Sequence, residues 1–138
     1  QYSLRNYQRT LEDYSDYVEI ARNAGAGETL DRIIPEIYNE AMFPGTAMLY
    51  SFPSYVYSLW QEYSVEELEY IASFCKEKEI PAATVYWEYW SEETEKIFEK
   101  NGISLYVYTV NDRDQARRYI SQGAEGICTD FLTAEDLW

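Results

Sequence analysis

The sequence contains no histidine, and among its 138 residues it has only two cysteines and six glycines. Without histidine, the Ser-His and Cys-His pairs of nucleophilic catalysis are excluded from this chain. Cys75 and Cys128 stand alone and fit no metal-ligand spacing, so we predict two buried thiols rather than a disulfide. The glycines lie apart in turn-like segments, which excludes a glycine-rich phosphate loop.

Positive charge is also scarce: the sequence has 11 basic and 25 acidic residues, which gives a net charge of −14. No basic face is available to neutralise phosphates, so nucleic-acid binding is not expected. Adsorption to an anionic membrane surface is disfavoured for the same reason. No apolar run is long enough to span a membrane, and no signal peptide is expected. The sequence does not indicate the cellular compartment of the protein.

Aromatic residues are abundant, with 15 tyrosines and four tryptophans, and hydrophobic residues make up 46% of the chain. This composition predicts a folded protein with a sizeable core. Most of the rings are explained by amphipathic packing, in which the ring is buried and its polar tip reaches water. An aromatic-lined ligand groove is the alternative interpretation.

Hydrophobic periodicity predicts a first helix over 3–23, followed by alternating strands and helices. The five predicted strands lie near 33–38, 54–60, 82–87, 104–110 and 126–130. Helices are expected over 64–78, 91–100 and 114–122, with one or two helical turns near 46–51 after a Pro44-Gly45 turn. Regular alternation with about 20 to 28 residues between strands is typical of parallel (β/α) repeats, so the fold class is α/β.

Local sequence signals support the predicted helix ends. Ser64 and Glu67 form a capping box, and the helix that follows buries Leu68, Ile71, Ala72 and Cys75. Asn111 and Asp112 carry the short oxygen-bearing side chains that cap helices, directly before the helix of 114–122. Thr133 is expected to cap a last helical turn that runs into Trp138.

Two segments near the end of the chain resemble the last two strands of the glycerophosphodiester phosphodiesterase family. They are Val107-Tyr108-Thr109-Val110-Asn111 and Gly123-Ala124-Glu125-Gly126-Ile127-Cys128-Thr129-Asp130. Ile33-Ile34-Pro35-Glu36-Ile37-Tyr38-Asn39 resembles a segment of a bacterial branch of that family, where Gln is usual in place of Glu36. The resemblance implies that the strands are the fourth to eighth of a TIM-type (β/α)8 barrel with covering helices. Residues 1–138 would then form a single partial domain lacking the first three strands.

The same resemblance implies metal-dependent hydrolysis of glycerophosphodiesters to glycerol 3-phosphate and an alcohol. The family uses a divalent metal, Mg or Ca, held by carboxylates, together with two histidines as acid and base. It carries these groups on the first three strands, in His-Arg-Gly, Glu-x-Asp, His and Glu-x-Lys motifs that this sequence lacks. We therefore expect no catalytic or metal-ligating residue here, no metal bound by this chain alone, and no activity of the chain alone. Whether it acts as an enzyme stays open.

The substrate-facing wall is the part of the site that the resemblance assigns to this chain. Tyr106, Tyr108 and Asn111 match family positions that face the reacting phosphate or alcohol, with Tyr108 in place of the commoner Trp. For Asn111, helix capping is the favoured rival role. Asp130 is expected to fix the closing loop rather than to contact ligand.

Two further pairs of residues share a face of their predicted strands: Glu36 with Tyr38, and Thr84 with Tyr86. Glu36, Tyr38 and Thr84 complete the set of predicted substrate-binding residues. Glu36 has the chemistry to bind a cation or a glycerol hydroxyl, although a salt-bridged structural role is favoured.

Five strands of a barrel would leave two open sheet edges and an uncovered interior. The expected partner is therefore the missing N-terminal half of the barrel or a second copy of the chain. The chain has no initiating Met and starts within a predicted helix, so we expect it to be a piece of a longer protein. Two alternatives stay open: a non-catalytic binding or interaction module built on a degenerate half barrel, and an independent flavodoxin-like α/β domain.

Overall fold

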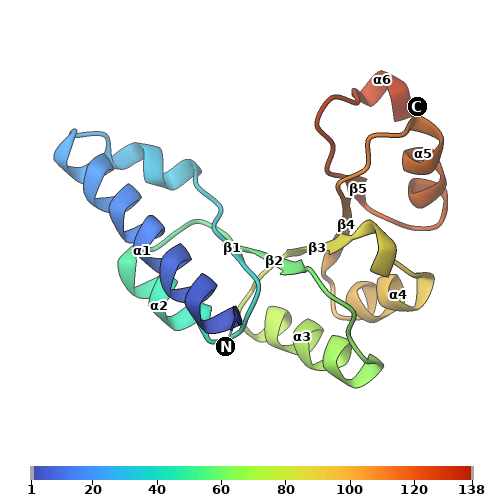
Figure 1. The fold of residues 1–138 in the computed structure, drawn as a ribbon, viewed down its shortest axis with the longest axis horizontal. Helices are drawn as coiled ribbons and strands as arrows, with labels where there is room; N and C mark the ends of the chain where they lie inside the picture. Colours follow the sequence, from blue (N-terminus) through green and yellow to red (C-terminus); the bar gives the residue numbers. More distant parts are fainter. Residues whose placement is uncertain (1, 138) are drawn as a thin grey trace. The chain divides into compact units, whose positions relative to one another are not determined.

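The structure is a computed structural model that describes residues 2–137, with side chains described from residue 7 onward. Five strands alternate with helices along the chain (Figure 1). The chain divides into two compact units, Gln1–Tyr55 and Val56–Trp138.

The first unit is built around α1 (Tyr2–Asn23), which packs against α2 (Met42–Leu49) and the 3-10 helix η1 (Gly27–Arg32). Gly25, at φ 65°, ends α1 in the left-handed conformation that glycine adopts without strain. At Gly45 a Cβ atom would lie 3.1 Å from Leu11 Cδ2, so the small residue allows α2 to approach α1 closely. The buried side chains of this unit include those of Val18, Leu30, Pro35, Ile37, Met42, Thr46, Phe52 and Tyr55.

Two sequence predictions for this unit need correction. The strand predicted over 33–38 is only β1 (Glu36–Ile37), because Pro35, directly before it, has no N–H for a ladder. The Pro44-Gly45 turn is wrong, since both residues lie inside α2. Proline is tolerated there because the first turn of a helix needs no N–H donor from it.

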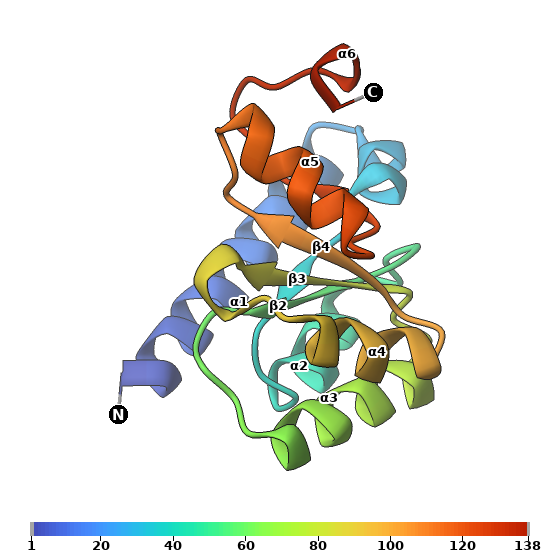
Figure 2. The same ribbon diagram turned by 90° about the vertical axis from the view of Figure 1, so that its right-hand side faces the viewer.

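The second unit contains four parallel strands paired in chain order (Figure 2). They are β2 (Val56–Leu59), β3 (Ala82–Tyr86), β4 (Ser104–Tyr108) and β5 (Gly126–Ile127). In β3 and β4 buried residues alternate with half-buried ones, which gives the sheet one face in the core and one that is partly open.

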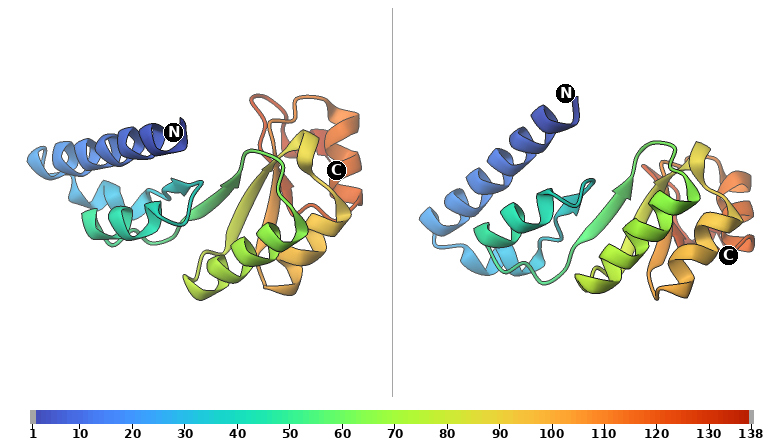
Figure 3. Two further views of the ribbon diagram at one scale, coloured as in Figure 1. Left: turned by 60° about the horizontal axis from the view of Figure 1, so that its bottom comes forward. Right: turned by 90° about the horizontal axis from the view of Figure 1, so that it is seen from below.

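The helices α3 (Val65–Glu77), α4 (Glu92–Lys100) and α5 (Arg113–Ser121) lie on one side of this sheet (Figure 3). Their apolar stripes meet the core face of the strands, and the predicted stripe of α3 is confirmed: Leu68, Ile71, Ala72 and Cys75 are buried. Other large buried residues of the unit include Tyr57, Leu59, Ile80, Val85, Phe98, Leu105, Val107, Val110 and Tyr119. A short η2 (Trp87–Tyr89) follows β3, and α6 (Ala134–Leu137) follows β5.

Most predicted helix ends in this unit are confirmed. In the Ser64–Glu67 capping box, Glu67 N–H donates to Ser64 Oγ and Ser64 N–H donates to the Glu67 carboxylate. Ser91 caps α4 by accepting from Thr94 N–H at 3.1 Å. The last turn is present as α6, and the predicted end at Trp138 lies outside the described residues.

No disulfide joins Cys75 and Cys128, as predicted, but only Cys75 is fully buried and Cys128 is half-buried. None of the described helices is both long enough and apolar enough to cross a membrane.

Candidate functional site

The partly open face of the sheet carries four side chains that we call the tyrosine face: Thr84, Tyr86, Tyr106 and Tyr108. The parallel register sets Thr84 opposite Tyr106 and Tyr86 opposite Tyr108. Because the strands alternate strictly, these four side chains point away from the helices. The structure thus brings together three predicted substrate-binding residues, Thr84, Tyr106 and Tyr108, and adds Tyr86.

Tyr106 lies directly over β5, where it is paired with Gly126. A Cβ atom at position 126 would stand 2.7 Å from Cδ1 and Cε1 of the Tyr106 ring, well inside van der Waals contact. Gly126 therefore creates the space in which the ring rests. Sequence reasoning did not assign Gly126 to the site, although a glycine inside a strand is a known mark of close approach.

Tyr108 leans in the opposite direction, towards β2. Its ring centroid is 5.8 Å from that of Tyr86, and its hydroxyl donates to Leu59 O at 3.4 Å. Leu59 is the last residue of β2, so the Tyr108 ring spans the C-terminal ends of three neighbouring strands. In parallel α/β folds this is the end at which ligands bind.

Thr84 contributes a buried hydroxyl to the centre of the tyrosine face. Its Oγ1 has no hydrogen-bond partner among the described residues. Buried hydroxyls are almost always paired, so this oxygen is a candidate contact for a ligand or a covering segment.

Asn111 follows β4 and is held by the loop after β5, not by the helix that follows it. Its Nδ2 donates to Asp130 Oδ2 at 2.8 Å, and its Oδ1 accepts from Thr129 Oγ1 and from Asp130 N–H, both at 3.0 Å. The favoured helix-capping role is therefore wrong: Asp112 is the cap of α5, accepting from Gln115 N–H at 2.8 Å. The expected loop-fixing role of Asp130 is confirmed.

These contacts use both acceptor positions of Asn111 Oδ1 and leave one amide hydrogen for any other partner. Asn111 is thus a positioning residue for the loops at the C-terminal ends of β4 and β5.

Replacing Asn111 with alanine should loosen these loops. Three exposed hydrogen bonds are lost, so we expect a loss of about 1 kcal/mol in the free energy of unfolding. Amide hydrogen exchange at Asp130 should accelerate more than this global loss explains. Gln115→Ala, on the exposed side of α5, is the matched control and should change neither quantity. Unchanged exchange at Asp130 in Asn111→Ala would show that the hydrogen bonds of the Asn111 side chain do not hold the loop.

Glu36 and Tyr38 belong to the first unit, where their contacts are local. The main-chain N–H and C=O of Glu36 both bond to the Tyr14 hydroxyl, at 3.0 and 2.9 Å. The Tyr38 hydroxyl lies 3.1 Å from Thr10 Oγ1. The Glu36 side chain is exposed, and the salt bridge favoured for it is absent among the described side chains.

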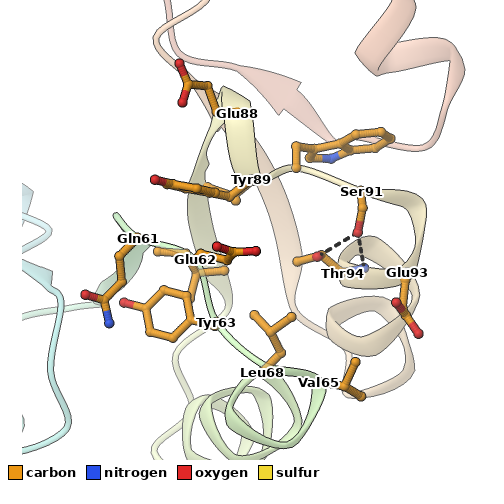
Figure 4. A pocket seen from close by; sticks show the side chains of 13 residues that line it. Gln61, Glu62, Tyr63, Val65, Leu68, Glu88, Tyr89, Ser91, Glu93 and Thr94 are labelled. Carbon is orange, nitrogen blue, oxygen red and sulfur yellow. Dashed lines mark hydrogen bonds between the residues drawn. The ribbon is translucent and has the colours of Figure 1, made fainter.

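A cavity of about 270 Å³ lies on the opposite, helix-bearing side of the sheet (Figure 4). Its floor is made by Leu59, Val85 and Leu68, and its walls come from the loops after β2 and β3 and from the first turns of α3 and α4. Sequence reasoning did not identify this cavity, because its walls are exposed loop residues without a motif.

The donor set for a metal ion is not present in the part of the chain that the structure describes. Within residues 2–137 there is no group of three or more His, Cys, Asp or Glu side chains able to hold a cation. The residues present therefore do not fit the metal centre that the sequence resemblance implies for the complete protein.

Comparison with known protein families matches the Glycerophosphoryl diester phosphodiesterase family over residues 37–134. The solved structures that share the fold include these two. One is a Silicibacter pomeroyi protein assigned as a glycerophosphoryl diester phosphodiesterase, at a TM-score of 0.68 and 14% identity; 93% of this chain and 43% of that chain are covered. The other is an Oleispira antarctica phosphodiesterase solved with the product sn-glycerol-3-phosphate, at a TM-score of 0.63 and 12% identity; 93% of this chain and 47% of that chain are covered. No curated protein sequence matches.

The chain thus spans less than half the length of each of these solved structures. The predicted fold class is confirmed: strands alternate with helices as in part of a phosphodiesterase TIM barrel. Because the family match covers most of its length, the chain belongs to the glycerophosphoryl diester phosphodiesterase family.

Proposed function

We propose that this chain is the C-terminal part of a metal-dependent enzyme that hydrolyses glycerophosphodiesters to glycerol 3-phosphate and an alcohol. The observation that carries the proposal is the family match over residues 37–134. Coverage of 43% and 47% of the two solved structures supports the further proposal that the first three strands of the barrel belong to another part of the protein.

In this proposal the tyrosine face is the substrate wall. A tyrosine hydroxyl can donate to a phosphate oxygen or exchange hydrogen bonds with a glycerol hydroxyl, while its ring covers the apolar edge of the substrate. Tyr106 and Tyr108 would make such contacts, and the buried Thr84 hydroxyl would find a partner. Asn111 would act mainly by holding the loops, and Glu36 and Tyr38 stay proposed substrate contacts from the first unit.

Family members use a divalent metal, which supplies charge stabilisation at the phosphate when it is bound. The described residues offer no cluster to hold it, and the sequence has no histidine. The metal ligands and the acid-base pair are therefore assigned to the part of the barrel outside this chain, and the chain contributes substrate binding and positioning.

The isolated chain should show no turnover of glycerophosphocholine with either Mg²⁺ or Ca²⁺ present, because it lacks an acid-base pair. Release of glycerol 3-phosphate, followed by a coupled assay, is the measurement. Turnover above the protein-free rate, abolished by a chelator, would contradict the proposed division of the site.

A non-catalytic binding module is the second candidate, and the aromatic character of the tyrosine face favours it. Rings on a partly open sheet face suit the capture of a ligand or a polypeptide even without catalysis. The sequence that precedes this chain in its parent protein separates the two: a His-Arg-Gly motif near a first strand supports the enzyme, and its absence supports the module.

The outer edge of β5 indicates what kind of partner the sheet needs. β5 is the terminal strand of the sheet order, and its outer edge has no strand partner among the described residues. Such an edge is an association site unless it is covered. We propose that the remaining barrel strands cover it, or a second copy of this chain when those strands are absent; the oligomeric state of the isolated chain in solution reports which applies.

A further inference from the structure

The cavity on the helix side of the sheet combines aromatic rings with carboxylates. Of the 13 described residues that line it, three are aromatic and three are glutamates, and none is a lysine or an arginine. They are Tyr63, Tyr89 and Trp90 with Glu62, Glu88 and Glu93. Leu59 and Val85 form its floor from the core face, and none of the four residues of the tyrosine face lines it, although the wall residue Tyr89 contacts Tyr86 of that face.

The side chains around the cavity are not equivalent. In Figure 4 the Glu62 carboxylate lies between the ring of Tyr89 and the ring of Tyr63, above Leu68, whereas Glu88 points away from the cavity. Tyr89 is held in place by packing against Tyr86, with ring centroids 5.8 Å apart. Trp90 is likewise held by Tyr119, with ring centroids 5.3 Å apart. Tyr89 and Trp90 are thus each packed against a neighbouring tyrosine ring.

An anion is the competing occupant, because the first turns of α3 and α4 border the cavity and helix N-termini attract negative charge. Both helices already have side-chain caps, Ser64 bonding to Glu67 N–H and Ser91 bonding to Thr94 N–H. An anion would also have to lie beside the Glu62 carboxylate with no basic residue in the wall. The electrostatics therefore favour a cation.

A bare metal ion is a poor match for the same walls, since no metal-binding cluster exists among the described residues and aromatic faces do not coordinate hard cations. A cation with an apolar surface suits them better. Alkylammonium groups are attracted to aromatic faces by the ring quadrupole and to a carboxylate by charge, and their methyl or methylene groups pack on apolar floors.

We propose that this cavity binds a small organic ammonium ion, with Glu62 as its counter-charge and the rings of Tyr63 and Tyr89 as its walls. The indole N–H of Trp90 is buried in the wall without a partner among the described residues, so it is available to an acceptor atom carried by such a ligand. The proposed site does not rest on the proposed phosphodiester hydrolysis, because none of the residues that line it belongs to the tyrosine face.

The test uses tetramethylammonium chloride and its uncharged near-isostere, tert-butanol, titrated into the chain and followed by amide chemical shifts. Sodium chloride at equal ionic strength is the blank. We expect saturable shifts of residues 61–65 and 88–94 with tetramethylammonium, and affinity for tert-butanol at least about threefold weaker, as a cation–π contribution at a partly exposed site predicts. Absence of saturable shifts, or equal affinity for both probes, would overturn the proposal.

Two variants locate the site. Glu62→Gln and Tyr89→Leu should each weaken tetramethylammonium binding by about threefold or more, since each removes one attractive element. Tyr70→Leu is the matched control, because Tyr70 is 64% exposed on α3 and does not line the cavity. Unchanged affinity in both site variants, or an equal loss in Tyr70→Leu, would contradict the assignment.

Discussion

Replacing Gly126 with alanine should displace the Tyr106 ring and destabilise the second unit. The new Cβ would lie 2.7 Å from two ring carbons, so either the ring leaves its place over β5 or the strand moves. Overpacking of this kind costs about 1 to 3 kcal/mol, and the half-buried ring has some freedom to move, which favours the lower part of that range. Denaturant unfolding gives the loss, and the ring chemical shifts of Tyr106 report the displacement.

A double-mutant cycle shows whether the clash with the ring is the cause. In a Tyr106→Ala background the Gly126→Ala change should cost at least about 1 kcal/mol less, since the clashing atoms are gone. Gly27→Ala is the matched control, because Gly27 has no atom within 4 Å of its Cβ position and no positive φ. An equal cost of Gly126→Ala in both backgrounds would show that the close approach to Tyr106 is not the reason for glycine at this position.

Replacing Glu95 with glutamine should stabilise the chain at alkaline pH and not at acidic pH. Burial, together with the negative charges of Glu99 and Glu125, raises the pKa of the Glu95 carboxyl from 4.5 to about 7. One of its oxygens, Oε2, is buried without a partner, as is Oε1 of Gln122. The carboxyl therefore favours its neutral form in the folded state.

The sign of the pH dependence follows from proton uptake. Between the unfolded pKa of 4.5 and the folded pKa of about 7, the folded chain holds a proton that the unfolded chain has released. The free energy of unfolding must then fall as pH rises through this window and level off above it. For a half-buried group screened by solvent, we expect Glu95→Gln to recover about 1 to 2 kcal/mol at about pH 8 and close to nothing at about pH 4.5.

Thermal or urea unfolding at both pH values measures this effect. Glu69→Gln, at an exposed position of α3, removes the same charge from the chain without the burial and serves as the control. An equal gain in Glu95→Gln at both pH values, or an equal gain in Glu69→Gln at alkaline pH, would contradict a buried titrating carboxyl.

Local patterns predicted the parts of the fold that depend on neighbouring residues in sequence. The capping box of Ser64 and Glu67 and the buried stripe of α3 both arise within one helix, and both are confirmed. The strand boundaries were less predictable. The strand predicted over 126–130 stops at Ile127, because Thr129 and Asp130 turn to hydrogen-bond Asn111.

Asn111 shows why the candidate site was only partly predictable. Its position before α5 is compatible with two roles: an N-cap of that helix, or a contact with the loop residues 18 and 19 positions further along the chain. Sequence spacing cannot distinguish these roles, since the choice depends on which strands are neighbours. The same holds for Gly126 and Tyr106, whose close approach requires the β4–β5 register.

The family relationship was predictable because two short motifs near the end of the chain indicated it, and the family match over residues 37–134 confirms it. The shared face of Thr84, Tyr106 and Tyr108 followed from strand alternation once the register was known. The helix-side cavity was not predictable. Its walls meet only when the loops after β2 and β3 fold over the first turns of two helices.

The most direct test of the account measures glycerol 3-phosphate release by a polypeptide in which this chain is joined to the sequence that precedes it in its parent protein. With Mg²⁺ or Ca²⁺ that polypeptide should hydrolyse a glycerophosphodiester, lose the activity on chelation, and lose catalytic efficiency when Tyr108 is replaced by alanine but not when Tyr70 is. Absence of turnover by the joined polypeptide, or full activity of its Tyr108→Ala variant, would contradict the proposal that this chain supplies the substrate wall of a phosphodiesterase.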